Sequence, residues 1–140
     1  MHPTLTLLKN NEYIEGYWAS FRNDSTSIYP WPISASFEDN HEWFSNRIEF
    51  LSKLKLIEKE LEEKENIRME NTYPHVLSFR GLATCRLCRN IKFIGHKEFV
   101  LRDPHEGTMI TMRWPIGYRH YLKCHDVVPS SLFISLINSH

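Results

Sequence analysis

The sequence lacks an excess of charge of either sign, since 17 lysines and arginines balance 17 aspartates and glutamates. Proteins that bind nucleic acid without sequence preference usually carry a basic excess, because neutralising phosphates supplies most of their affinity. The charge balance therefore argues against general nucleic-acid binding and leaves only a local basic patch for that role.

Long apolar runs are also missing. The N-terminal stretch MHPTLTLLKNNEY holds only a short apolar segment, which Lys9 ends, and no small-residue cleavage site follows it. We therefore expect no signal peptide, and no run approaches the roughly 18 apolar residues of a membrane helix. These absences predict a cytoplasmic protein with no membrane partner.

Cysteine and glycine are scarce, with three and five residues. Two of the cysteines, Cys85 and Cys88, form a Cys-x-x-Cys pair, which in a reducing compartment indicates metal or redox chemistry rather than a disulfide framework. The sequence has no phosphate-binding glycine loop, no nucleophile elbow and no HExxH motif. We therefore expect that the protein is not an enzyme.

What is present is the composition of a folded protein, with 41% hydrophobic and 13% aromatic residues in a chain of 140. This length allows one domain or two small lobes that share a core. The pattern changes near Tyr73, so we divide the chain into residues 1–72 and residues 73–140 and expect one shared core.

The first half is predicted to contain an aromatic segment and one long helix. Residues 1–35 combine aromatic side chains with turn and proline signals, which favours an irregular segment packed by its rings, with at most a short strand. Residues 37–65 repeat apolar side chains at helical intervals, and Ser36 and Asp39 can each open a capping box. The charged end of the helix, residues 58–65, is expected to project into water.

Arg47 falls inside the apolar stripe of this helix. One interpretation is that its stem packs while its guanidinium reaches an acid such as Glu58, or solvent. The other is that it anchors an anionic ligand.

The second half reads as short strands followed by two helices. Residues 97–102 and 108–114 are predicted to pair as a hairpin around a turn at 103–107. Pro115 is predicted to lie in the first turn of a helix that runs to about His125, and the Pro129-Ser-Ser sequence opens a last short helix.

One set of cysteines and histidines has the spacing of a metal site. A Cys-x2-Cys turn lets two thiolates reach one zinc ion, and a histidine pair separated by four residues falls within the usual zinc-ligand spacing. The 31 residues between the two pairs exceed the dozen or so of a DNA-reading finger, and a β-hairpin fits that gap. We therefore predict one structural zinc ion, bound by Cys85, Cys88, His120 and His125.

Two alternatives stay open from the residues alone. Cys85 and Cys88 can form a redox dithiol, although such a motif usually starts a helix and the residues after Cys88 resemble a strand. Cys124 lies four residues after His120 and can replace His125 as the fourth ligand; otherwise we expect it to be a small buried apolar residue.

The motifs around these cysteines and histidines also resemble those of a known group of proteins. The stretch from Arg80 to Cys88, together with Trp114-Pro115-x-Gly117-Tyr118-x-His120-Tyr121-x3-His125-x-Val127-x-Pro129-x3-Phe133, resembles a set of uncharacterised small bacterial zinc-finger-like proteins with a CxxC turn and a WPxGxxHYxxxHxVxxPxxF tail. The likeness covers roughly residues 79–134. It implies a zinc site at the same four positions and favours His125 over Cys124, but it implies no activity.

Two further sets of residues are weaker candidates for a functional role. Acidic and imidazole side chains in the predicted turn could bind a second metal or act as acid and base, although a surface turn explains them as well: Asp103, His105 and Glu106. Three tryptophans could stack on nucleobases, but such residues more often belong to the core of a small fold: Trp18, Trp31 and Trp114.

The predicted fold is α+β, with an N-terminal aromatic segment and a long amphipathic helix packed on a zinc-bound β-hairpin/helix unit. A closed site with four protein ligands leaves no position for substrate, so the zinc is expected to stabilise the fold. We therefore expect a small, zinc-stabilised, non-enzymatic protein that binds another protein, such as an immunity-type inhibitor or accessory factor. Its contact candidates are Trp18, Trp31 and Arg47.

Two other functions are compatible with the sequence. The first is a nucleic-acid-binding zinc module; its basic candidates are Arg86, Arg89, Lys92, Arg113, Arg119 and Lys123. The second is a metal-dependent nuclease that would act through the turn from Asp103 to Glu106.

Overall fold

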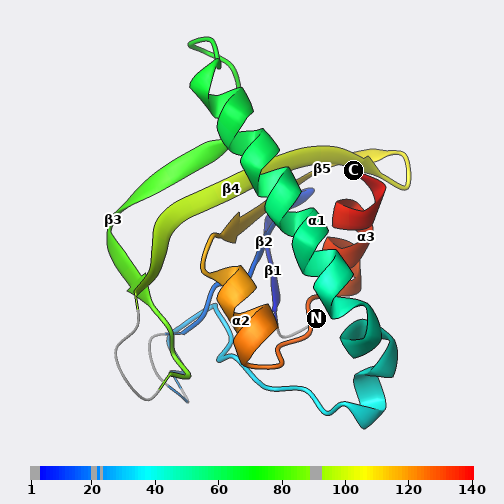
Figure 1. The fold of residues 1–140 in the computed structure, drawn as a ribbon. Helices are drawn as coiled ribbons and strands as arrows, with labels where there is room; N and C mark the ends of the chain where they lie inside the picture. Colours follow the sequence, from blue (N-terminus) through cyan, green and yellow to red (C-terminus); the bar gives the residue numbers. More distant parts are fainter. Residues whose placement is uncertain (1–3, 20–21, 23, 89–92) are drawn as a thin grey trace.

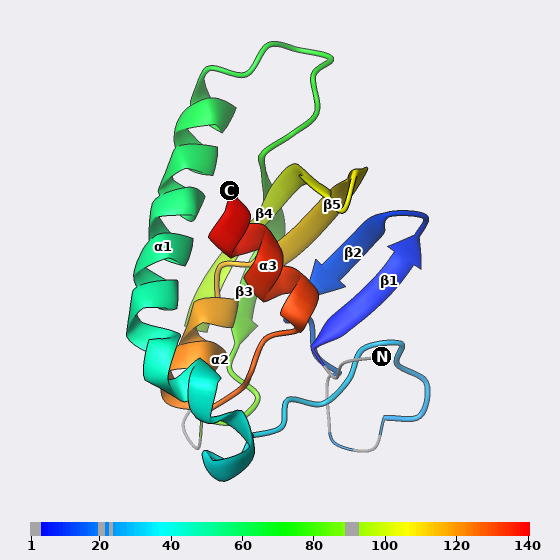
Figure 2. The same ribbon diagram turned by 90° about the vertical axis from the view of Figure 1, so that its right-hand side faces the viewer.

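The computed structural model describes residues 4–19, 22, 24–88 and 93–140. It has the predicted α+β fold: a mixed five-stranded sheet in the order β1-β2-β5-β4-β3, with helices α1, α2 and α3 on one face (Figures 1 and 2). The strands are β1 (Leu5–Lys9), β2 (Glu12–Glu15), β3 (Val76–Thr84), β4 (Phe93–His105) and β5 (Thr108–Pro115).

Both halves of the chain contribute to this sheet. The N-terminal hairpin joins it through a parallel pairing of β2 with β5, whereas the other neighbouring strands are antiparallel. The apolar core likewise combines residues from the two halves, such as Trp18 and Leu54 with Trp114 and Phe133. The sheet and the core are therefore common to residues 1–72 and 73–140.

The β1–β2 hairpin is more regular than the expected irregular segment. Asn11 has a φ of 59°, a left-handed conformation that asparagine tolerates better than most residues and that lets the chain reverse between the strands. The described residues between β2 and Glu38 contain no helix or strand, in agreement with the rest of that prediction.

Glu15 fastens this hairpin to the helical layer. Its carboxylate is fully buried and accepts hydrogen bonds from the Tyr118 hydroxyl at 2.6 Å, the Thr4 hydroxyl at 3.0 Å, and the Ser130 amide at 2.9 Å. Burial raises the pKa of Glu15 to about 7, and these hydrogen bonds lower it only in part. Such a carboxylate ties β2 to the start of α3 (Ser131–Ser139), whose N-cap is Ser130.

Helix α1 (His41–Asn66) follows a short 3-10 turn, η1 (Glu38–Asn40), and crosses the sheet diagonally (Figure 1). The predicted Ser36 capping box is only half formed: the Asp39 amide donates to the Ser36 hydroxyl at 3.2 Å, but the Asp39 carboxylate accepts from that hydroxyl at 2.9 Å and not from the Ser36 amide. The N-cap of α1 is Asn40, whose side chain makes no capping hydrogen bond. The face that α1 turns toward the sheet is apolar and includes the buried residues Trp43, Phe50, Leu54, Ile57 and Leu61.

The prediction that residues 58–65 project into water is wrong for Glu58 and Leu61, which are buried, although Lys59, Glu63 and Lys64 are exposed. Glu58 is only 2% exposed, accepts a hydrogen bond from the Trp114 indole at 2.8 Å, and pairs with Arg119. Burial raises the pKa of Glu58 to about 7, while the Arg119 charge and the hydrogen bonds lower it only in part.

Arg47 forms an ion pair, which is the first of its two predicted roles, but its partner is Asp126 and not Glu58. Its guanidinium pairs with Asp126 at 2.8 Å and lies over the Phe44 ring, 5.2 Å from the ring centre. The stem packs on the helix and the charge is balanced by an acid from the segment after α2 (Tyr118–Cys124).

The predicted β4–β5 hairpin is confirmed, but its turn is shorter than expected. His105 pairs with Thr108, and only Glu106 and Gly107 form the connection, with φ values of 50° and 80°. Two successive positive φ angles match a two-residue turn that follows the twist of the strands. Asp103 therefore belongs to β4 and not to the turn.

The helix boundary predicted at Pro115 is wrong, because Pro115 still belongs to β5 and α2 has Gly117 as its N-cap. The last helix is confirmed as α3. The Ser130 hydroxyl accepts from the Phe133 amide at 3.2 Å and caps it. Within the described residues, the structure contains no apolar helix of the length that a bilayer crossing requires.

Gly16 supports a first prediction, for stability. It has a φ of 78°, and a Cβ at this position would lie 2.4 Å from Cδ1 of the buried Tyr118 ring. Gly107 has a similar φ of 80° but no atom within 4 Å of such a Cβ. We expect Gly16→Ala to lower the free energy of unfolding by about 3 kcal/mol, because strain and overpacking add.

The matched control is Gly107→Ala, which carries the backbone strain alone and should cost about 1 kcal/mol. Urea unfolding followed by tryptophan fluorescence measures both. Equal losses in the two variants would mean that the Tyr118 ring moves aside and that its packing against Gly16 contributes nothing.

Candidate metal centre

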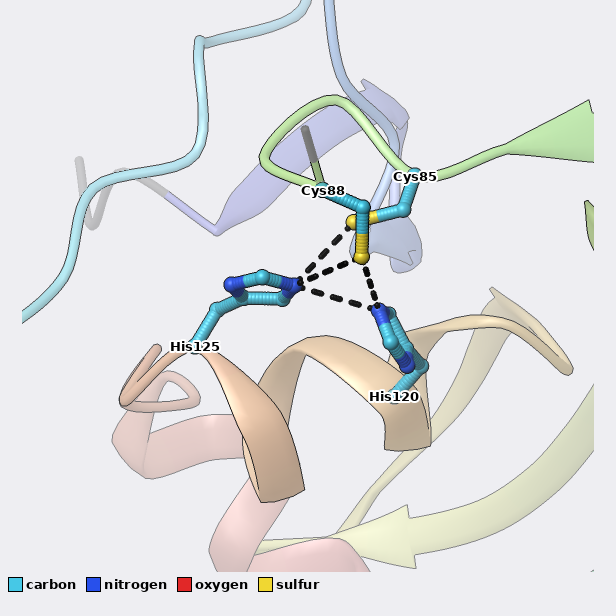
Figure 3. Close-up of side chains that lie close together, drawn as sticks. All are labelled: Cys85, Cys88, His120 and His125. Carbon is cyan, nitrogen blue, oxygen red and sulfur yellow. Dashed lines mark hydrogen bonds between the residues drawn. The ribbon is translucent and has the colours of Figure 1, made fainter. Parts of the chain in front are cut away.

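Cys85 and Cys88 lie in the turn that follows β3, on the side of the sheet that carries α2 (Figure 3). The Leu87 amide points back at the Cys85 sulfur, at 3.4 Å. An amide directed at sulfur stabilises a thiolate, since a hydrogen bond to the charged form favours it. Neither cysteine lies in a helix, so the geometry lacks the helix start that a redox dithiol usually has.

The two histidines come from α2 and its end. His120 lies within the helix, whereas His125 is the C-cap with φ −126° and ψ 14°, outside the helical range. The His125 amide still donates to the Tyr121 carbonyl at 3.1 Å. The helix thus ends at Cys124, and the change of backbone direction at His125 brings its ring beside that of His120 (Figure 3).

The four side chains converge on one point (Figure 3). The two Nε2 atoms are 3.1 Å apart, Cys85 Sγ lies 3.3 Å from His125 Nε2, and Cys88 Sγ lies 3.4 Å from both Nε2 atoms. Their ligand atoms all lie within 4.8 Å of one another. Lone pairs held this close repel unless protons or a cation stand between them, so Cys85, Cys88, His120 and His125 could hold a metal ion.

Cys124 is not part of this group. It is exposed, although we expected a buried residue if it were not a ligand, and it lies on α2 away from the convergence point. The structure therefore brings His125, and not Cys124, to the other three side chains.

Tyr121 supports the centre from within α2. Its hydroxyl accepts a hydrogen bond from the Arg86 amide at 2.7 Å, inside the Cys-x-x-Cys turn, and its ring packs against Trp18 with ring centres 5.2 Å apart. Burial raises the pKa of Tyr121, the Arg86 amide lowers it, and a hydrogen bond with Cys85 raises it further. The tyrosine therefore stays neutral and joins the turn to the helix.

The N-terminal segment closes the other side of the centre. Ser34 donates its hydroxyl to the His125 carbonyl at 2.7 Å, and the Arg86 guanidinium donates to the Ala19 carbonyl at 3.0 Å. We did not identify these residues or Tyr121 from the sequence. The sequence signals for Tyr121 are its place in the motif that carries the resemblance and its position next to His120 on a predicted helix; Ser34 and Ala19 carry no signal.

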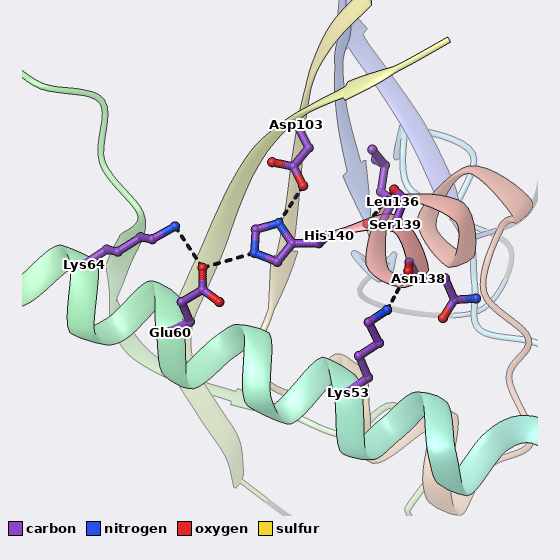
Figure 4. A network of polar contacts seen from close by, with 8 residues as sticks. All are labelled: Lys53, Glu60, Lys64, Asp103, Leu136, Asn138, Ser139 and His140. Carbon is purple, nitrogen blue, oxygen red and sulfur yellow. Dashed lines mark hydrogen bonds and ion pairs between the residues drawn. The ribbon is translucent and has the colours of Figure 1, made fainter.

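The acidic and imidazole residues of the predicted turn do not gather into a second site. His105 and Glu106 are 4.0 Å apart, whereas Asp103 pairs at 2.6 Å with His140, which also contacts Glu60 at 3.1 Å (Figure 4). Burial lowers the pKa of His140, but the hydrogen bonds with the two acids outweigh it, so the net shift is upward. Asp103 therefore helps to fasten α3 to α1 and β4.

The tryptophans are mostly core residues. Trp18 is 9% exposed and Trp114 is fully buried, so neither can stack on a nucleobase or serve as a contact on the surface. Trp31 is half-buried, and the Arg22 guanidinium lies 5.9 Å from its ring centre.

Most of the described basic candidates already have partners. Arg113 pairs with Glu98 and Glu12, and Arg119 pairs with Glu58. Arg86 donates to two backbone carbonyls. Lys123 is exposed, and Arg89 and Lys92 lie outside the described residues.

Comparison of the chain with protein-family models, with curated proteins and with solved structures finds no match.

Proposed function

We propose that Cys85, Cys88, His120 and His125 hold one structural zinc ion. Tetrahedral zinc, with bonds of about 2.3 Å to sulfur and about 2.0–2.1 Å to nitrogen, sets two nitrogens about 3.3 Å apart and a sulfur about 3.6 Å from a nitrogen. The separations here are 3.1 Å between nitrogens and 3.3–3.4 Å between sulfur and nitrogen. Two thiolates and two imidazoles are also a donor set that zinc favours.

The role of the ion would be to join elements that are distant in sequence. It links the turn after β3 to α2, and four protein ligands leave no open position for a substrate or an activated water. When bound, zinc supplies folding energy and not a reactive group.

We further propose that the protein acts by binding another protein, as an accessory factor or an immunity-type inhibitor. The observation that supports this is the exposure of large apolar side chains on and just before α1: Phe37 is 56% exposed, Ile48 83% and Leu56 67%. Phe37 packs on the Phe44 ring, which Arg47 covers. Exposed apolar patches that include aromatic and arginine side chains are typical of protein interfaces.

The nucleic-acid alternative has less support. Three arginines near the cluster (Arg86, Arg113 and Arg119) bind carboxylates or carbonyls of the protein itself. Using them to neutralise phosphates would leave buried acids such as Glu58 unpaired, at a cost in stability.

A crosslinking experiment tests the protein-binding function. A photo-crosslinking amino acid at position 48 should capture a defined protein from an extract of the source cells, identified by mass spectrometry. The matched control is position 109, because Met109 is also exposed, at 51%, but lies at the β4–β5 turn. Equal capture from both positions would show non-specific contact.

The same protein should bind single- or double-stranded DNA and RNA no tighter than about 10 μM at physiological salt. Fluorescence anisotropy measures this. Sub-micromolar binding that weakens steeply with salt would contradict the proposal and favour the nucleic-acid module.

A further inference from the structure

A groove of about 690 Å³ lies beside the second half of α1. Residues of α1 form one wall, Ile116 and Arg119 near the start of α2 form the other, and Phe99 of β4 supplies the floor. The volume falls in the range of ligand-binding pockets, about 300–1,000 Å³. This groove is separate from the metal centre, although Arg119 of its wall is the neighbour of His120.

The two acidic side chains that line the groove already have hydrogen-bond or ion-pair partners. Glu58 accepts from the Trp114 indole and pairs with Arg119, and Glu62 pairs with Lys97 at 3.1 Å. Neither carboxylate is therefore available to balance a further cation. The groove has no unpaired acid, among the described residues, that would repel an anion.

Unlike the acids, the lysines of the groove have no ion-pair partner among the described residues. Lys55 and Lys59 are exposed on α1, and neither forms an ion pair within the part of the chain that the structure describes. Residues four apart lie on the same face of a helix, about 6 Å along its axis. The wall thus presents two unpaired cations at a defined spacing.

Apolar side chains lie next to these cations. Leu56 is 67% exposed on α1, Ile116 forms part of the opposite wall, and Phe99 lies at the floor. An exposed leucine beside unpaired lysines is complementary to a ligand that carries both carboxylates and an apolar side chain.

We infer that this groove binds an acidic, apolar segment of the protein partner. Carboxylates two residues apart in an extended chain are separated by about 6.6 Å, close to the spacing of Lys55 and Lys59. An apolar side chain of the same segment packs on Leu56 and Ile116. The inference rests on the proposed protein-binding function and names the chemistry of the partner.

Labelled peptides test the groove in the zinc-loaded protein by fluorescence anisotropy at low salt. A peptide of alternating glutamate and leucine should bind about tenfold more tightly than matched peptides with serine for leucine or glutamine for glutamate. The double variant Lys55→Glu/Lys59→Glu should lose about tenfold in affinity for the first peptide. Lys123→Glu, an exposed lysine of α2 outside the groove, is the control and should bind within about twofold of the unaltered protein.

The possible outcomes distinguish a wrong assignment of the groove from a wrong protein-binding function. Equal peptide affinities, or equal losses in the double variant and the Lys123→Glu control, would overturn the groove. Tighter binding of a single-stranded oligonucleotide, lost in the double variant, would assign the groove to nucleic acid and also overturn it. If crosslinking from position 48 persists unchanged in the double variant, the protein-binding function stands and only the groove is wrong.

Discussion

Cys88→Ser should abolish metal binding and unfold the region where the turn after β3 meets α2. Structural zinc contributes about 10–16 kcal/mol in small finger domains, which is comparable to the whole stability of a typical domain. The substitution removes the sulfur that lies 3.4 Å from both histidine nitrogens. Elemental analysis should show less than one zinc per chain. Near-ultraviolet circular dichroism should show loss of the packing of Trp18 on Tyr121.

Matched variants separate the ligand set from its neighbours. His125→Ala should be about as damaging as Cys88→Ser, whereas Cys124→Ser should keep the metal and the fold, because Cys124 is exposed and lies outside the cluster. X-ray absorption at the zinc edge should show two sulfur and two nitrogen ligands. A metal-free protein with an unchanged fold, or a first shell with three sulfurs, would refute the assignment.

Arg119→Ala is also expected to have a large effect, a loss of about 3 kcal/mol in the free energy of unfolding at pH 8. The substitution leaves Glu58, which is 2% exposed, without its cation in a site too buried for water to replace it. Breaking a buried pair from one side is costly because the remaining charge is uncompensated.

The pH dependence of this loss follows from the pKa of Glu58, which burial raises to about 7. A raised carboxyl pKa means that the folded state holds its proton more tightly, so the stability from protonated Glu58 is present at low pH and is lost as the pH rises through 7. Arg119 lowers this pKa, and its removal therefore raises it further. The difference between Arg119→Ala and the unaltered protein should be smaller at pH 6 than at pH 8.

Arg47→Ala is the control, because its pair with Asp126 is partly exposed, at 27% and 57%. Exposed pairs contribute about 1 kcal/mol or less, so this variant should change little. Urea unfolding in excess zinc at the two pH values measures all three proteins. Equal losses in both variants, or an Arg119→Ala loss that does not depend on pH, would show that Glu58 is not held as a buried carboxylate.

Local signals carried the correct predictions. The Cys-x-x-Cys spacing and the His120–His125 spacing each place two side chains within reach of one point, and the structure brings the two pairs together. The β4–β5 hairpin depends on a glycine in the connection, and α3 depends on a capping serine. The spacing within each pair, the hairpin connection and the helix cap are each decided within a few residues, which is why the sequence predicts them.

The errors came from contacts between distant segments. Glu58 looks like part of a charged, solvated helix end, but Arg119 and Trp114, more than 50 residues later, cover it. The β1–β2 hairpin has weak local signals and is completed by pairing of β2 with β5. The residues around Glu58 and around the β1–β2 hairpin do not predict these contacts, because the partners lie far away in the sequence.

The choice between Cys124 and His125 shows the same division at the metal centre. The sequence by itself determined that two cysteines and at least one histidine of this region can meet, because ligand type and spacing are local. Only the tertiary structure shows which side chain lies beside the other three: α2 ends at Cys124, whose thiol is on an exposed helix face, whereas His125 belongs to the cluster. The non-helical backbone of His125, held by Ser34 through its carbonyl, turns its ring inward. Helix ends and burial depend on what packs against them, and that information is spread over the whole chain.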